Sequence, residues 1–126
     1  MKKPIWINHS LIKVLQEELI ATHGGQPGIR DEGLLDAALN RPNQLFSYGN
    51  PDLFELATAY ISGIIRNHPF LDGNKRTAFL AGVLFLENNG KYLIAPEAEA
   101  TQAVLDLAVK KIKEHEFAVW LKKNCK

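Results

Sequence analysis

Apolar residues recur at spacings of three and four along almost the whole chain. These spacings place side chains on one face of an α-helix, whereas a half-buried strand alternates with a period of two. The pattern therefore predicts an all-α fold of six or so helices. A short extended piece is expected at residues 91–94, where the sequence reads KYLI.

The first two predicted helices carry start and stop signals. Asn8 or Ser10 is placed to cap the first, and the run His23-Gly24-Gly25 ends it, since glycine readily follows the last turn of a helix. Its predicted buried stripe consists of Leu11, Val14, Leu15 and Leu19. After a polar loop, Asp31 is placed to cap a short helix over 32–40 that ends before Pro42.

Two strongly apolar helices are predicted in the middle of the chain. Residues 52–66 begin with Asp52 as a cap and carry apolar side chains on nearly every side, which is typical of a central buried helix. A second apolar helix spans 74–88 and ends at Asn89-Gly90. A helix over 97–113 follows, with Ala98, Leu105, Ala108, Val109 and Ile112 on its predicted apolar face. The last helix contains Phe117, Val119, Trp120 and Leu121.

Composition narrows the class of protein. The length of 126 residues, with 46% hydrophobic and 23% charged residues, fits a single globular domain over residues 1–126. Cys125 is the only cysteine, so no intramolecular disulfide is possible, which suits a reducing compartment. The sequence has no signal-peptide pattern and no apolar run long enough to span a bilayer, so a cytoplasmic location without a membrane is expected. A net charge of +1 gives no reason to expect direct binding to nucleic acid.

The loop between the two apolar helices carries the candidate chemistry. It reads HPFLDGNKRTA over residues 68–78 and leads into a helix N-terminus, where free N–H groups bind anions. His68 is a candidate general base and Asp72 a candidate Mg²⁺ ligand. Gly73, Asn74, Lys75 and Arg76 are candidate phosphate-binding residues: the glycine frees the backbone, Asn74 caps the helix or donates its amide, and the two cations attract phosphate.

Taken one at a time, these residues also have ordinary structural roles. His68 can cap a helix, Asp72 and Gly73 can form a turn, and Asn74 is a common N-cap. Phe70 and Leu71 are predicted to fill the core and pin the loop. Lys75 and Arg76 can be solvated first-turn residues, but two cations there oppose the helix dipole, which favours an anionic ligand. Just before the motif, Arg66 can reach a phosphate or pair with a nearby acid.

The stretch HPFLDGNKRTA resembles the signature of the Fic/Doc (Fido) family, H-x-F-x-[DE]-[AG]-N-[GK]-R. The upstream GIRDEGLLDAALNRP is similar to the death-on-curing branch, so the resemblance covers essentially the whole chain. It implies the compact Fido fold, with His68 as catalytic base, Asp72 as Mg²⁺ ligand and residues 73–76 as the site for ATP phosphates. The loop around residues 24–31 would be the flap against which family members lay their target segment.

Two positions separate this chain from relatives that transfer AMP, which usually read G-N-G-R-x-x-R. Lys75 replaces the second glycine and Phe79 stands at the second arginine. This pattern is similar to death-on-curing toxins, which resemble kinases that phosphorylate a hydroxyl of elongation factor Tu. The resemblance also implies a small Phd-like antitoxin as partner. An AMP transferase remains as an alternative function, and a catalytically silent antitoxin-binding module as a second.

Overall fold

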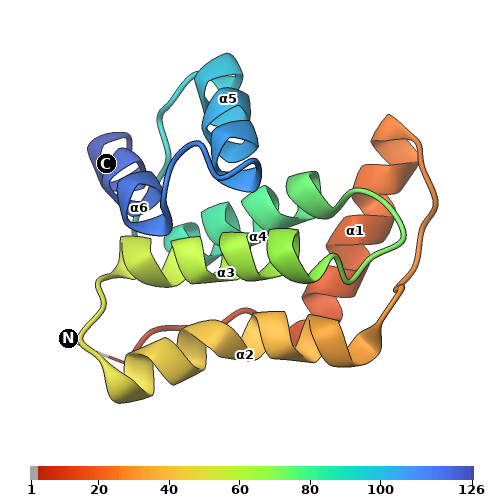
Figure 1. Ribbon diagram of the computed structural model, residues 1–126, viewed down its shortest axis with the longest axis horizontal. Helices are drawn as coiled ribbons and strands as arrows, with labels where there is room; N and C mark the ends of the chain where they lie inside the picture. Colours follow the sequence, from red (N-terminus) through yellow and green to blue (C-terminus); the bar gives the residue numbers. More distant parts are fainter. Residues whose placement is uncertain (1–2) are drawn as a thin grey trace.

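The computed structural model describes residues 3–126 and is built from helices, as the sequence predicts (Figure 1). Six helices occur in the described part of the chain: α1 (His9–His23), α2 (Glu32–Tyr48), α3 (Leu53–Asn67), α4 (Asn74–Asn88), α5 (Glu97–Ala108) and α6 (Glu114–Lys123). None of the helices in residues 3–126 is long and apolar enough to cross a bilayer. The all-α prediction is therefore confirmed.

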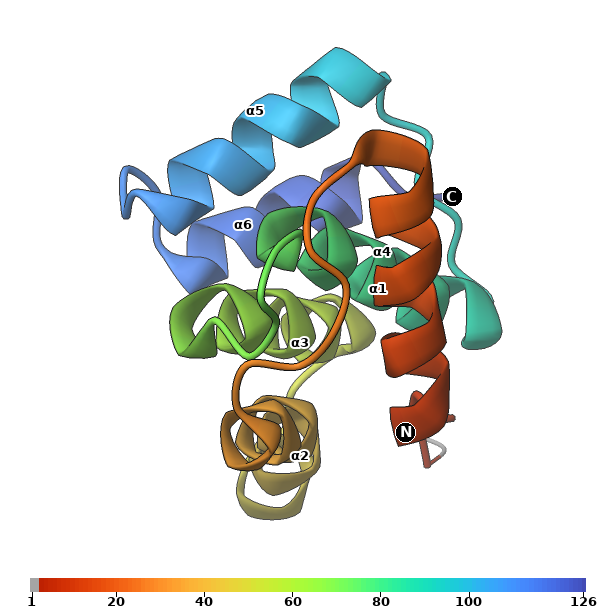
Figure 2. The same ribbon diagram turned by 90° about the vertical axis from the view of Figure 1, so that its right-hand side faces the viewer.

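Helix α3 is the centre of the fold. Its residues from Leu56 to Ile64 are all buried, and α2, α4 and α6 pack around it. Figure 2 shows α2 on one side of α3, with α4, α5 and α6 on the other and α1 standing across the end. The start of α3 is fixed by a capping box, in which Asp52 and Glu55 satisfy each other's backbone N–H groups. The prediction of a central buried helix is confirmed.

Helices α3 and α4 approach each other closely at Gly82. A Cβ atom built on this glycine would lie 2.6 Å from Cγ1 of Ile61, so a side chain at this position would require Ile61 to move. The close approach fixes how α4 crosses α3. It thereby places the two ends of the 68–73 loop, one at the end of α3 and one at the start of α4.

Helix α2 does not stop before Pro42, as the sequence suggested, but continues to Tyr48. Proline removes one backbone N–H from the helix, which on local grounds favours termination. Tertiary packing outweighs that cost here. Pro42 is itself buried, and Phe46 in the next turn packs edge-on against Trp6 with ring centroids 5.7 Å apart.

Two further sequence predictions about helix faces were wrong. In α1 the buried side chains are Ile12, Gln16 and Ile20, whereas Leu11 and Val14 of the predicted stripe are 39% and 47% exposed. The buried stripe contains a glutamine, which concealed it from a search for apolar periodicity. Helix α5 ends at Ala108 rather than 113 and buries a different face from the predicted one: Ala100, Ala103, Val104 and Leu107.

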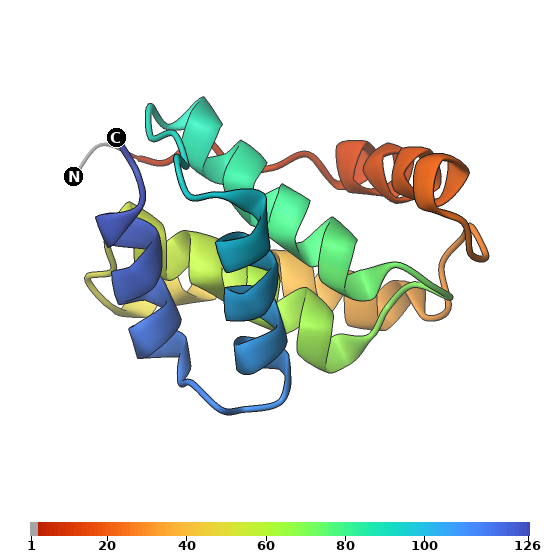
Figure 3. The ribbon, with the colours of Figure 1, turned by 90° about the horizontal axis from the view of Figure 1, so that it is seen from above.

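The C-terminal part of the chain packs back onto the segment after α4. Leu93 forms an isolated antiparallel bridge with Cys125, and the backbones of Tyr92 and Lys126 exchange two hydrogen bonds of 3.1 and 2.9 Å. The extended piece predicted at 91–94 is therefore present. Figure 3 shows α5 and α6 lying side by side after this segment, joined by the turn at 109–113.

Candidate active site

The structure brings all six predicted site residues into one groove. Its volume is about 690 Å³, and it is lined by the end of α3, the 68–73 loop and the start of α4, with α1 and α5 forming its sides. The predicted site residues in its lining are His68, Asp72, Gly73, Asn74, Lys75 and Arg76. The groove is therefore the candidate active site.

His68 is the C-terminal cap of α3 and is exposed to the groove. Its backbone has φ 50° and ψ 52°, the left-handed conformation that residues other than glycine rarely adopt. Arg30 holds this turn in place, because its Nε donates to the His68 carbonyl at 2.7 Å and its Nη2 donates to the Asn67 carbonyl at 3.0 Å. The guanidinium thus satisfies two carbonyl groups at the end of α3 and holds the backbone from which the His68 imidazole extends.

The loop at residues 24–31 runs directly beside the 68–73 loop (Figure 2). Ile29 and Phe70 form an antiparallel bridge, the Arg30 N–H donates to the Pro69 carbonyl at 2.7 Å, and the Leu71 N–H donates to the Gly28 carbonyl at 3.1 Å. Phe70 is fully buried, as predicted, and anchors the loop. Leu71 was wrongly assigned to the core: it is 44% exposed, because it follows the bridge and faces away from the interior.

Gln16 joins these two loops to α1. It is almost completely buried, its Nε2 donates to the Asp72 carbonyl at 3.0 Å, and its Oε1 accepts from the Gly28 N–H at 3.1 Å. The Asp72 carboxylate in turn accepts from the Gln26 N–H at 2.7 Å through Oδ2. One oxygen of the candidate metal ligand therefore contacts the 24–31 loop, while Oδ1 takes part in no recorded hydrogen bond among residues 3–126.

The first turn of α4 has the properties of an anion site. Gly73 precedes it with φ 73°, and a Cβ there would lie 3.2 Å from Cδ1 of Ile20. No side chain caps this N-terminus and no acidic residue lies in its first turn, unlike α2 and α3. Lys75 and Arg76 are exposed there. The free N–H groups and two cations attract negative charge from the groove.

Asn74 has a different position from the one expected of an N-cap. It is the first residue of α4, is buried, and its side chain pairs with the backbone of Phe70. Its Oδ1 accepts from the Phe70 N–H at 3.0 Å, and its Nδ2 donates to the Phe70 carbonyl at 3.1 Å. Asn74 therefore holds the shape of the loop, and only the second hydrogen of its amide is left for a ligand.

These residues fit a nucleotide with Mg²⁺. One exposed carboxylate beside an uncapped, cationic helix N-terminus is the donor set that Mg²⁺ shares with nucleotide phosphates. The Thr77 hydroxyl, buried in the same turn of α4, is also without a hydrogen-bond partner among the described residues. Arg66 is not part of the groove, since it pairs with Glu114 at 2.7 Å.

Sequence reasoning missed several residues that shape the groove. Arg30, Gln16 and Gln26 act through contacts more than thirty residues away in sequence, so no local spacing reveals them. His23 from α1 and the pair Glu97 and Thr101 from α5 also line the groove. Only the packing of α1 and α5 against α4 places these last three beside the motif.

One histidine outside the groove has acidic neighbours that the sequence did not indicate. His9 Nε2 lies 2.7 Å from Asp36 Oδ1, and Glu32 is close enough for the three ligand atoms to lie within 4.8 Å of one another. Lys13 Nζ pairs with Glu32 at 2.8 Å. These contacts connect α1 to the start of α2 and so support the base of the 24–31 loop.

Comparison with known proteins agrees with this geometry. The chain is 48% identical over 75 residues to "Toxin Doc" of Mycolicibacterium smegmatis, in an alignment that covers 57% of this chain and 57% of that protein. It is 42% identical over 82 residues to "Protein kinase doc" of Escherichia phage P1, with 59% and 65% covered. The chain thus aligns with less than two thirds of either relative. A model of the Fic/DOC family matches residues 6–86, which include α1, α2, α3, most of α4 and the whole stretch 68–78. The chain belongs to the Fic/DOC family.

Proposed function

We propose that this protein is a toxin of a toxin–antitoxin system that transfers the γ-phosphate of ATP to a serine or threonine hydroxyl of a translation factor. Elongation factor Tu is the expected target. The observation that carries the proposal is the gathering of an exposed histidine, an exposed carboxylate and an uncapped cationic helix N-terminus in one groove. The printed name of the phage relative, a protein kinase, supports the same reaction.

In the proposed reaction His68 accepts the proton of the target hydroxyl. The hydroxyl oxygen forms a new bond to the γ-phosphorus of ATP, the bond between that phosphorus and the β,γ-bridging oxygen breaks, and ADP leaves with the electron pair. The N–H groups of the first turn of α4, with Lys75 and Arg76, hold the negative charge of the phosphates. Mg²⁺, when bound by Asp72 and the phosphates, neutralises part of that charge.

Lys75 and Phe79 favour transfer of phosphate over transfer of AMP. Both line the groove, one in the first turn of α4 and one in the second. Lys75 adds a point charge where the AMP-transferring pattern has glycine, and Phe79 puts an apolar ring where that pattern has an arginine. A phosphate chain therefore contacts positive charge at the start of α4 and none one turn later. This favours a placement of the nucleotide different from that in relatives that transfer AMP.

The 24–31 loop supports the target segment in this proposal. It already pairs with the 68–73 loop through the Ile29–Phe70 bridge, and it contacts Asp72 through the Gln26 N–H. A substrate segment laid along this loop would bring its hydroxyl beside His68. The protein would act in the cytoplasm, and a Phd-like antitoxin would inhibit it by covering the groove.

Labelled ATP separates the proposed reaction from its alternatives. The purified chain, Mg²⁺ and a cell extract are incubated with ATP labelled at the α or the γ phosphorus, with His68→Ala as control. Transfer of the γ label alone, lost in His68→Ala, is the expected result. Transfer of the α label would instead identify an AMP transferase, and no transfer above the control would favour the silent binding module.

A further inference from the structure

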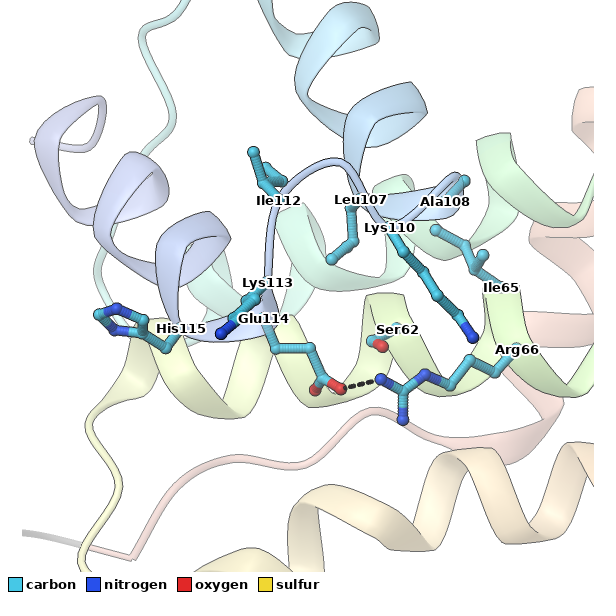
Figure 4. A pocket seen from close by; sticks show the side chains of 10 residues that line it. All are labelled: Ser62, Ile65, Arg66, Leu107, Ala108, Lys110, Ile112, Lys113, Glu114 and His115. Carbon is cyan, nitrogen blue, oxygen red and sulfur yellow. Dashed lines mark ion pairs between the residues drawn. The ribbon is translucent and has the colours of Figure 1, made fainter.

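A second cavity lies at the C-terminal end of α5. It has a volume of about 520 Å³ and opens between the last turns of α3, the end of α5 and the turn that leads into α6 (Figure 4). The two cavities have no lining residue in common. Whatever binds here therefore binds outside the candidate active site.

The interior of this cavity is apolar except for one hydroxyl. Ile65, Leu107 and Ile112 contribute apolar side chains to the lining. Ser62 is only 3% exposed and reaches the cavity from α3, and its hydroxyl takes part in no recorded hydrogen bond among residues 3–126. The hydroxyl is open to the cavity, where water can reach it, and a ligand that displaces this water has to replace its hydrogen bond. Ser62 therefore marks a place for a polar atom of a ligand.

The rim of the cavity is cationic. Lys110 and Lys113 line it and form no ion pair within residues 3–126, and Arg66 lies on the α3 side. In Figure 4 the Lys110 side chain extends toward Arg66 across the opening. The one carboxylate in the lining, Glu114, is already paired with Arg41 at 2.8 Å and Arg66 at 2.7 Å. The two lysines are thus left without a counter-charge.

We propose that this cavity binds a small organic anion, in which a phosphate or carboxylate group is joined to an apolar body about the size of one aromatic ring. The acidic group would lie against Lys110, beside Arg66, the body would cover Ile65, Leu107 and Ile112, and a polar atom would bond to the Ser62 hydroxyl. The volume is within the range of small-molecule sites, and an apolar interior with a few polar groups is their usual composition. Inorganic phosphate alone would leave the apolar surface uncovered.

Phenyl phosphate is a suitable probe, followed by the backbone amide resonances of the ¹⁵N-labelled full chain. Saturable shifts are expected at residues 62–66 and 107–113. Phenol and inorganic phosphate, which each supply one half of the probe, should bind at least about tenfold more weakly. Benzoate is the second probe. Tighter binding of benzoate assigns the site to a carboxylate, and tighter binding of phenyl phosphate assigns it to a phosphate. Either result supports the proposal. Shifts at residues 73–76 would report separate binding to the α4 N-terminus.

Two variants test the residues that carry the proposal. Lys110 has φ 62°, so Lys110→Asn removes the charge with a residue that tolerates this backbone, and Lys122→Asn on α6 is the matched control outside the cavity. Lys110→Asn should weaken phenyl phosphate binding about tenfold, and Lys122→Asn should leave it unchanged. Ser62→Ala should weaken binding about threefold and leave the melting temperature unchanged or higher, because the hydroxyl has no partner to lose.

The proposal is overturned if phenyl phosphate causes no saturable shift at residues 62–66 and 107–113. Equal affinity for inorganic phosphate, or equal loss in Lys110→Asn and Lys122→Asn, would also overturn it. None of these outcomes depends on phosphate transfer at His68. Failure of the proposed reaction and failure of this site are therefore distinguishable.

Discussion

At the scale of single residues, the position of His68, the proposed catalytic base, depends on a backbone turn that a histidine does not adopt by preference. The left-handed conformation of His68 costs about 1–2 kcal/mol for a residue with a Cβ. Arg30 offsets this cost by donating to the carbonyls of Asn67 and His68. A residue from the 24–31 loop thus holds the backbone from which the His68 side chain extends, without belonging to the motif.

Arg30→Ala should lower the kcat of phosphate transfer by about tenfold or more and change the KM for ATP little, because the imidazole loses its alignment while the anion site stays intact. Arg30→Lys retains one donor and should restore part of the rate. Steady-state kinetics of the three proteins, with melting curves to exclude unfolding, test this. An unchanged kcat in Arg30→Ala would show that the guanidinium only closes the end of α3.

Lys75→Gly should lower the rate of phosphate transfer by at least about tenfold, since it removes a charge from the first turn of α4, where the phosphates are expected. Initial rates at saturating and limiting ATP measure the effect. Unchanged kinetics would mean that Lys75 is an ordinary solvated residue at a helix start.

Asp72→Asn is the matching test of the proposed Mg²⁺ ligand. Asparagine preserves the shape of the side chain and can still accept from the Gln26 N–H, but it carries no charge for Mg²⁺. The variant should fold as the wild type does and require a much higher Mg²⁺ concentration for transfer. A titration of activity against Mg²⁺ measures this, and coincident curves for the two proteins would remove Asp72 from the metal site.

At the scale of helices, the sequence predicted well which helices exist and in what order. It predicted poorly which face of each helix is buried. The capping residues Asn8, Asp31 and Asp52 act locally, so their helix starts were predictable from the sequence. The end of α2 was not, because the burial of Pro42 and the contact of Phe46 with Trp6 depend on residues far away in the chain. The buried face of α1 was missed because Gln16 is buried to serve the loops of the site rather than the core.

The α3–α4 crossing gives a prediction at this scale. Gly82→Ala should lower the free energy of unfolding by about 1–3 kcal/mol, because the new methyl group has no room against Ile61. Asn88→Ala, at the exposed end of the same helix, is the control and should have little effect. Urea denaturation measures both, and equal stability of Gly82→Ala and the control would show that the two helices separate at little cost.

At the scale of the whole molecule, the N-terminal segment is connected to the central helix through Tyr60. Burial raises the pKa of the Tyr60 hydroxyl, although the hydrogen bond that it accepts from the Ile7 N–H at 3.2 Å acts in the opposite direction. The unfolded chain then releases this proton near pH 10 while the folded chain retains it. The contribution of Tyr60 to stability is therefore complete below about pH 10 and declines as the pH rises toward the higher folded pKa.

Urea denaturation between neutral pH and about pH 11 tests this linkage. The wild type should lose more stability above about pH 10 than Tyr60→Phe, which has no proton to release. The other tyrosines and the lysines are the same in both proteins, so the difference between the two curves isolates Tyr60. Parallel curves would contradict the assignment.

The organisation of the site as a whole was partly predictable. HPFLDGNKRTA is contiguous, so its six candidate residues were identified from the sequence and lie in one groove. The contributions of the 24–31 loop, of Gln16 and of α5 could be identified only from the structure, because they depend on how separate helices pack.

The central claim is that His68 and the start of α4 transfer a phosphate group to a translation factor. It is tested most directly by the intact mass of purified elongation factor Tu after incubation with this protein, ATP and Mg²⁺. We expect an increase of one phosphate group on a single serine or threonine, absent when His68→Ala replaces the wild type. An increase of one AMP, or an unchanged mass with a folded chain that binds ATP, would contradict it.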